Sequence, residues 1–244
     1  MDGQRLRTSL ADAAAGVADL VVGAVRGSGA IGLAAYVNSF ADTKVAMGAV
    51  RLVGADLFAP HLLLGRPVDT GDAAVIADSF AVFPSGTGGE ADTRERRVTA
   101  WRDWATGRML CHANVEVSPS RAASTPAAGT VAMLLGRSRD WREWSANAAA
   151  LCPLALPGVG GPVQEAVAEG TRPLAQGTTR AMLRRDFVTA ARLVRWLALL
   201  TSAGVRQPLD PIQLVERIRL YGGSGSRLSL DLTIARTILG MEPA

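Results

Sequence analysis

The chain has 244 residues, which is enough for one large domain or two small ones, and 48% of them are hydrophobic, 20% charged and 5% aromatic. This composition excludes a mainly disordered chain, because disordered segments are poor in apolar residues and rich in charge. The 26 glycines follow no three-residue period, which excludes a collagen-like chain. A chain of this length can also bury a sizeable core without a disulfide or a metal.

Arginine supplies almost all of the positive charge, since Lys44 is the one lysine among 26 basic residues. The net charge of +4 is unevenly spread along the chain. Residues 177–244 hold ten arginines against five acidic residues, a net of +5, whereas residues 1–176 hold 16 basic and 17 acidic residues, a net of −1. Because arginine stays charged and binds phosphate or carboxylate through a planar fork, the last third of the chain is where we expect an anionic partner.

The first part of the chain predicts helices followed by a small β region. Apolar residues recur at helical spacing over residues 4–26, and residues 30–53 predict a second helix, with a strand as the alternative for 45–53. Short apolar runs between proline and glycine, at residues 61–64 and 75–76, suit strands. After an expected helix over 94–110, apolar and polar residues alternate over 109–117, which is the clearest strand pattern in the chain.

The second part predicts a linker and then helices. Residues 118–130 are rich in Ser, Pro and Ala, and helices are expected over residues 139–151, 178–203, 211–221 and 229–240. The expected fold class is therefore α+β: mainly α with a small central β region and a helical C-terminal third. The expected domains are 1–117 for the N-terminal helices and the β region, 118–130 for the linker and 131–244 for the basic helical region, with one continuous domain as the alternative.

Three glycines match the spacing G-x-G-x-x-G of dinucleotide-binding folds: Gly27, Gly29 and Gly32. In such a fold a strand precedes the glycines, a helix follows them, and an acidic residue after the second strand binds a ribose hydroxyl. Asp56 stands at the end of the segment that would form that second strand. These four residues are the candidate cofactor-binding residues if the motif is functional.

A helix, a glycine hinge and a second helix fit the same segment, and we favour this interpretation. Residues 4–26 have helical periodicity, and Arg26 stands where a strand would meet the first glycine. The hinge predicts a positive φ at Gly29 or Gly27. No cofactor is expected in this interpretation.

Two tryptophan pairs lie forty positions apart. The segment from Trp101 to Trp104 is echoed by the segment from Trp141 to Trp144, and a spacing of three puts both rings of a pair on one helical face. We expect all four indoles to be mostly buried in the core. A base-stacking surface is the alternative.

Side chains that carry catalysis or bind metals are scarce. The two histidines, His61 and His112, and the two cysteines, Cys111 and Cys152, lack the paired spacing of structural zinc sites. Cys111 and His112 are adjacent on the expected strand and so point to opposite faces, and Cys111 is expected to be a buried, inert thiol. No catalytic residue and no metal ligand is therefore expected.

A helix over residues 178–203 would carry a stripe of arginines. At 100° per residue, five of them fall within about 140° of one another, opposite an apolar face that suits a core. These five are the candidate nucleic-acid-binding residues: Arg180, Arg184, Arg185, Arg192 and Arg195.

The sequence predicts a non-enzymatic helical assembly protein that self-associates and contacts a polyanion, above all a nucleic-acid backbone, through this stripe. A nucleotide-dependent enzyme that uses the glycine motif and a protein-only adaptor with acidic partners are the alternatives. Neither a signal peptide nor a run of 18 apolar residues is visible. We therefore expect no transmembrane segment, and a location inside the cell or inside a particle.

Overall fold

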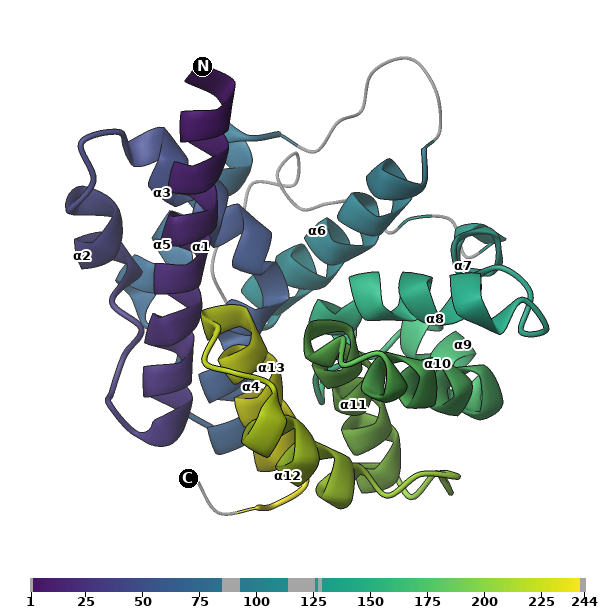
Figure 1. Ribbon diagram of the computed structural model, residues 1–244. Coiled ribbons are helices and arrows are strands. Elements are labelled where there is room, and N and C mark those ends of the chain that lie inside the picture. Colours follow the sequence, from purple (N-terminus) through teal and green to yellow (C-terminus); the bar gives the residue numbers. More distant parts are fainter. Residues whose placement is uncertain (1, 85–92, 114–125, 127–128, 242–244) are drawn as a thin grey trace. The chain divides into compact units, whose positions relative to one another are not determined.

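The computed structural model describes residues 2–84, 93–113, 126 and 129–241, and every element in these ranges is a helix (Figure 1). By contact clustering the chain divides into two compact units, Met1–Ala91 with Arg102–Thr125 and Asp92–Trp101 with Pro126–Ala244, here called unit 1 and unit 2. The linker expected at 118–130 falls almost entirely outside the described residues, so it stays a prediction.

The expected β region is wrong, because no strand occurs in the described part of the chain. Residues 109–112 are the last turn of α6 (Arg94–His112), and residues 114–117 lie outside the described ranges. The buried side chains of α6 include Trp101, Ala105 and Met109, which recur every four residues. This helical spacing continues into the segment whose short alternating pattern predicted a strand. The segment forms a helix because a helix buries these apolar side chains on one face.

Unit 1 contains α1 (Asp2–Arg26), α2 (Leu33–Asn38), α3 (Thr43–Val53), η1 (Gly54–Phe58), α4 (Ala59–Leu64) and α5 (Thr70–Val82), together with most of α6. The runs at 61–64 and 75–76 are therefore helical, in α4 and α5. Helix α3 packs against α1, α2 and α5, so it forms the centre of this unit.

An arginine is held inside unit 1 by the side chains of two neighbours. Both Nη atoms of Arg51, on α3, donate to the carboxylate of Asp103, on α6, one of them at 2.8 Å from Oδ2. The guanidinium also lies 3.6 Å from the centre of the Phe80 ring, on α5. This arginine therefore ties three helices together and is unavailable to an external anion.

One apolar stretch in the described residues, Thr43–Leu64, is long enough to span a membrane by length and composition alone. Most of it is buried inside the protein, and it is interrupted at Gly54, whose φ is +62°. A buried core helix passes the same test, so this stretch is weak evidence for a span.

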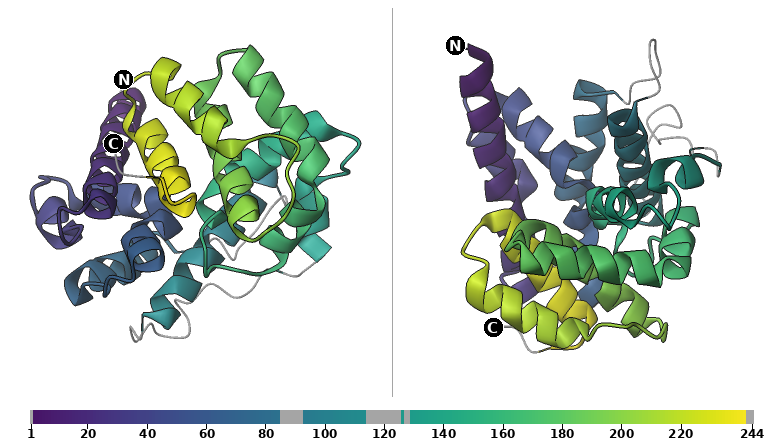
Figure 2. Two further views of the ribbon diagram at one scale, coloured as in Figure 1. Left: turned by 90° about the horizontal axis from the view of Figure 1, so that it is seen from below. Right: turned by 45° about the vertical axis from the view of Figure 1, so that its right-hand side comes forward.

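Unit 2 contains α7 (Gly129–Leu135), α8 (Trp141–Ala150), η2 (Cys152–Leu154), α9 (Pro162–Glu169), α10 (Thr171–Leu183), α11 (Phe187–Ser202), α12 (Pro211–Tyr221) and α13 (Ser226–Ile238) (Figure 2). Helix α11 is apolar around most of its circumference and packs against α8, α10, α12 and α13. The indole Nε1 of Trp196, on α11, donates to the carbonyl oxygen of Ala148 at 2.8 Å. Helix α11 is thus the core element of unit 2.

Helices α8 and α10 approach closely because a glycine faces a serine. A Cβ atom added at Gly177 would lie 2.2 Å from Cβ of Ser145. A second glycine, Gly170, leaves the space that the Trp144 ring fills, since its Cβ would lie 2.2 Å from Cζ2. These two glycines set the spacing of the helices that carry the site described below.

Three of the four tryptophans are buried as expected: Trp101, Trp104 and Trp144. Trp141 is half-buried and remains partly accessible to solvent. The expectation of burial is therefore confirmed for three indoles, and the fourth lies at the surface of unit 2.

Candidate functional site

The helix expected over residues 178–203 is two helices. Helix α10 ends at Leu183, where the amide of Arg185 donates to the carbonyl of Met182 and that of Asp186 to the carbonyl of Ala181. This pair of bonds is the Schellman pattern, which usually has glycine at the residue with positive φ. Here that residue is Arg185, with φ +56°, the one non-glycine with a positive φ in the described part of the chain.

Two arginines of the expected stripe are ion-paired with the buried carboxylate of Asp231. Arg195 is fully buried, and its Nη1 donates to Oδ1 of Asp231, on α13, at 2.8 Å. The other carboxylate oxygen lies 3.9 Å from Nε of the half-buried Arg192, and the thiol of Cys152 donates to Oδ1 at 3.2 Å. Asp231 thus gathers two guanidiniums and a thiol, which leaves Arg195 out of reach of any large ligand.

The other three candidates, Arg180, Arg184 and Arg185, are exposed. Two of them, Arg180 and Arg184, line a groove of about 620 Å³, here called the α10 groove. Its lining consists of Trp141, Arg142, Arg172, Ala175, Gln176, Thr179, Arg180, Leu183, Arg184 and Pro208.

The side chains that line the α10 groove give it a positive charge. Four arginines line it. Among the described residues no acidic side chain lines it, and none of the four arginines has an ion pair. Arg142 lies with its guanidinium 4.9 Å from the centre of the Trp141 ring, which is a cation–π contact and leaves its charge in place. The groove therefore offers uncompensated guanidinium donors beside an aromatic ring.

Elsewhere in unit 2 arginines form ion pairs with carboxylates. Glu216, on α12, accepts from Arg219 at 3.0 Å and from Arg236, on α13. The hydrogen bond from Arg219, together with that from Arg236, holds the pKa of Glu216 below its usual value. Acids and arginines are thus paired on the α12–α13 side and separated at the α10 groove.

Sequence reasoning missed two arginines of this groove, Arg142 and Arg172. A signal for Arg172 exists in the sequence, because residues 172, 176, 180 and 184 recur every four positions and share one face of α10. At a rise of 1.5 Å per residue, this face extends over about 18 Å. Arg142 comes from α8, and only the packing of α8 against α10 brings it to the groove.

The glycine motif forms a hinge between two helices. Gly27, Gly29 and Gly32 have φ values of +117°, +100° and +76°, which confirms the expected positive φ. The segments that would be parallel strands in a dinucleotide-binding fold lie in α1 and α3, so that fold is absent from this part of unit 1. The fourth candidate, Asp56, is fully buried in η1.

The first amides of α2 already have an anionic partner. The carboxylate of Asp72, on α5, accepts from the amides of Leu33 at 2.6 Å and Gly32 at 3.1 Å. A phosphate would therefore meet a carboxylate where the motif would otherwise offer free amides.

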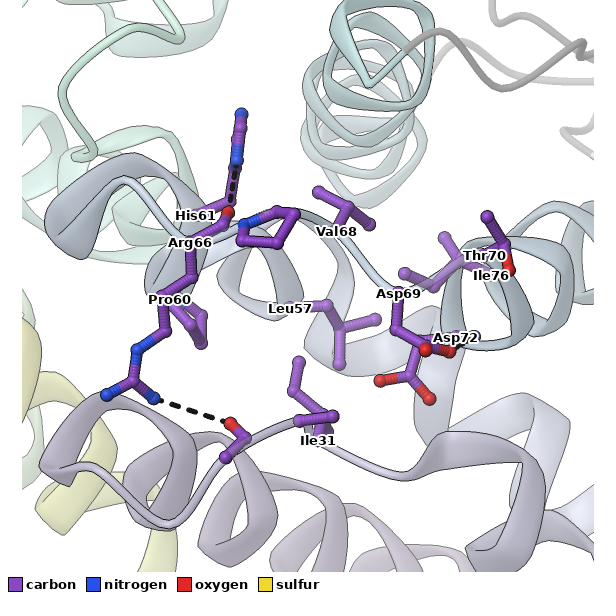
Figure 3. A pocket seen from close by; sticks show the side chains of 13 residues that line it. Ile31, Leu57, Pro60, His61, Arg66, Val68, Asp69, Thr70, Asp72 and Ile76 are labelled. Atoms are coloured by element: carbon purple, nitrogen blue, oxygen red, sulfur yellow. Dashed lines mark hydrogen bonds between the residues drawn. The ribbon is translucent and has the colours of Figure 1, made fainter.

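Beside this hinge lies a pocket of about 450 Å³ whose charged side chains already have backbone hydrogen-bond partners (Figure 3). Asp69 and Asp72 lie together on one side, while Arg66 extends toward the hinge and donates to Gly29 O at 3.4 Å (Figure 3). Arg66 also donates to Ala24 O at 2.8 Å. His61 Nδ1 lies 2.6 Å from Arg66 O. Two carboxylates against one arginine make this pocket a poor receptor for phosphate groups.

The remaining candidate side chains are dispersed. Cys111 is exposed near the end of α6, contrary to the expectation of a buried strand residue, and Cys152 is buried. No group of three or more His, Cys, Asp or Glu side chains placed to hold a metal occurs among the described residues.

Comparisons with protein-family models, with curated proteins and with solved structures find no match to this chain. The α10 groove is therefore the feature of the chain that bears on its function.

Proposed function

We propose that this protein binds the phosphate backbone of a nucleic acid through the α10 groove of unit 2. The observation that carries the proposal is the set of four arginines, none of them ion-paired within the described part of the chain, that line one groove together with Trp141. Arginine binds phosphate oxygens through two parallel N–H bonds, and phosphate contacts supply most of the affinity of nucleic-acid-binding proteins.

The electrostatic repulsion among these arginines also supports the proposal of phosphate binding. Four like charges along one groove repel one another, and a protein gains stability by placing acids among them, as it does around Glu216. An anionic ligand relieves that repulsion and releases its own condensed cations. A polyanion satisfies all four guanidiniums at once, whereas a small anion would reach one or two.

The test is the salt dependence of binding of the full chain to a fluorescent oligonucleotide. The variant R180A/R184A should bind more weakly, and the slope of log affinity against log salt should fall by about one for each arginine lost. The matched control is R137A/R206A, which removes two exposed arginines of unit 2 that lie outside the groove. Equal weakening in the two variants, or an unchanged slope in R180A/R184A, would contradict the proposal.

Self-association remains part of the proposal and has a separate test. Size-exclusion chromatography with light scattering, at low and high salt, measures the mass, and the absorbance ratio at 260 and 280 nm reports nucleic acid that co-purifies. A single monomeric species over the whole range of protein and salt concentration would remove self-association and leave the groove proposal standing.

A further inference from the structure

A second groove begins on the other side of Leu183. This groove, here called the α12 groove, has a volume of about 580 Å³ and is lined by Met182, Leu183, Arg185, Phe187, Arg217 and Tyr221. Leu183 lines both grooves and is 81% exposed, so it forms the ridge between them.

The α12 groove repeats the chemistry of the α10 groove. In the part of the chain that the structure describes, its two arginines, Arg185 and Arg217, have no ion pair and no acidic residue lines the groove. Its exposed aromatic side chain is Tyr221, which is 67% exposed. Asp186, next to Arg185, faces its own helix, because its carboxylate accepts from the amide of Thr189 at 3.1 Å.

The turn between α10 and α11 divides two neighbouring arginines between the grooves. Arg184 lines the α10 groove and Arg185 lines the α12 groove. Glycine would form this turn without strain, so the positive φ of Arg185 costs stability. Strained residues of this kind gather at ligand clamps.

From these observations, and resting on the proposed function, we infer that the nucleic acid is single-stranded and crosses the ridge at Leu183. Its phosphates contact the arginines of both grooves, and its bases lie against Trp141 in one groove and Tyr221 in the other. Two short grooves separated by an exposed leucine suit a flexible strand whose bases are unpaired and free to stack on aromatic rings. A duplex presents its bases only within its grooves and cannot stack them on these rings.

The experiment measures affinities of the full chain for four probes: an oligothymidylate, a DNA duplex of the same length, an inorganic polyphosphate chain of equal charge, and vesicles that contain phosphatidylserine. We expect the oligothymidylate to bind most tightly. Tyr221→Ala should weaken its binding about 5- to 150-fold, the range for loss of one stacked base, and should leave polyphosphate binding unchanged. Leu220→Ala is the matched control, because Leu220 is 65% exposed on the same helix and lies outside both grooves.

The variant Arg185→Gly distinguishes a loss of binding from a loss of stability. Glycine relieves the strained turn, so the free energy of unfolding should stay the same or rise, while the salt slope for oligothymidylate should fall by about 0.7. Duplex or polyphosphate binding as tight as that of oligothymidylate, together with no effect of Tyr221→Ala, would overturn the single-strand inference and leave the proposed function intact. Tighter binding to the vesicles than to the oligothymidylate would overturn the single-strand inference in favour of a membrane surface. Absence of binding to every probe would overturn both the single-strand inference and the proposed function.

Discussion

Replacing Asp231 by alanine should strongly destabilise unit 2. The change leaves the Arg195 guanidinium fully buried and removes the carboxylate that it binds at 2.8 Å. It also removes the acceptor of the Cys152 thiol. Loss of one partner of a buried ion pair costs about 3–5 kcal/mol, because the remaining charge stays desolvated.

The double variant R195M/D231L tests the same reasoning in the opposite direction. Apolar residues of similar volume replace both charges, so its free energy of unfolding should come within about 1 kcal/mol of the wild type or exceed it. Urea unfolding followed by tryptophan fluorescence gives the free energies, and hydrogen exchange of the α11 amides assigns the change to unit 2. A cost below about 1 kcal/mol for Asp231→Ala, as an exposed pair would give, or simple additivity in the double variant, would refute the argument.

Three further predictions concern packing, backbone and pH. Gly177→Ala should cost about 1–3 kcal/mol in thermal unfolding, because its Cβ would lie 2.2 Å from Cβ of Ser145, and Ser145→Gly should recover part of the loss. Gly29→Val should cost about 1–3 kcal/mol because φ is +100° there, with nucleic-acid affinity unchanged; a selective loss of nucleotide binding at unchanged melting temperature would contradict the hinge. Because Arg219 holds the pKa of Glu216 below 4.5, that carboxylate stabilises the fold above pH 4.5 and loses its effect as the pH falls through the lowered pKa. The melting temperatures of wild type and Glu216→Gln should therefore converge on acidification, and a constant difference would exclude this linkage.

Local signals in the sequence predict the helices that carry their own caps. The expected helix over 211–221 coincides with α12, because Asp210 accepts from the amide of Ile212 and Pro211 fills the first position. Periodicity over residues 4–26 likewise falls within α1. In both cases the decisive contacts lie within a few residues of one another along the chain.

The break between α10 and α11 shows where local signals fail. No glycine marks the end of α10, since Arg185 takes the position that glycine usually holds. The one local sign is Asp186, which caps α11. A helical wheel drawn through the break places Arg195 beside Arg180, whereas tertiary packing buries Arg195 against Asp231.

Local periodicity in the sequence also predicted part of the candidate site. Arg180, Arg184 and Arg185 lie near the end of one helix and are exposed, so periodicity finds them. Arg142 joins the groove only through the packing of α8 on α10, which depends on the small side chains at Gly177 and Ser145. Contacts between residues about forty positions apart produce no local periodicity in the sequence.

Arginine footprinting tests the central claim most directly. The full chain is treated with phenylglyoxal, which modifies accessible guanidiniums, with and without an oligothymidylate, and the modified sites are mapped by mass spectrometry. The account predicts protection of Arg142, Arg172, Arg180 and Arg184, and no protection of Arg137 and Arg206, which are exposed in the same unit outside the groove. Protection of the two controls to the same extent, or unchanged modification of the four groove arginines in the bound state, would contradict it.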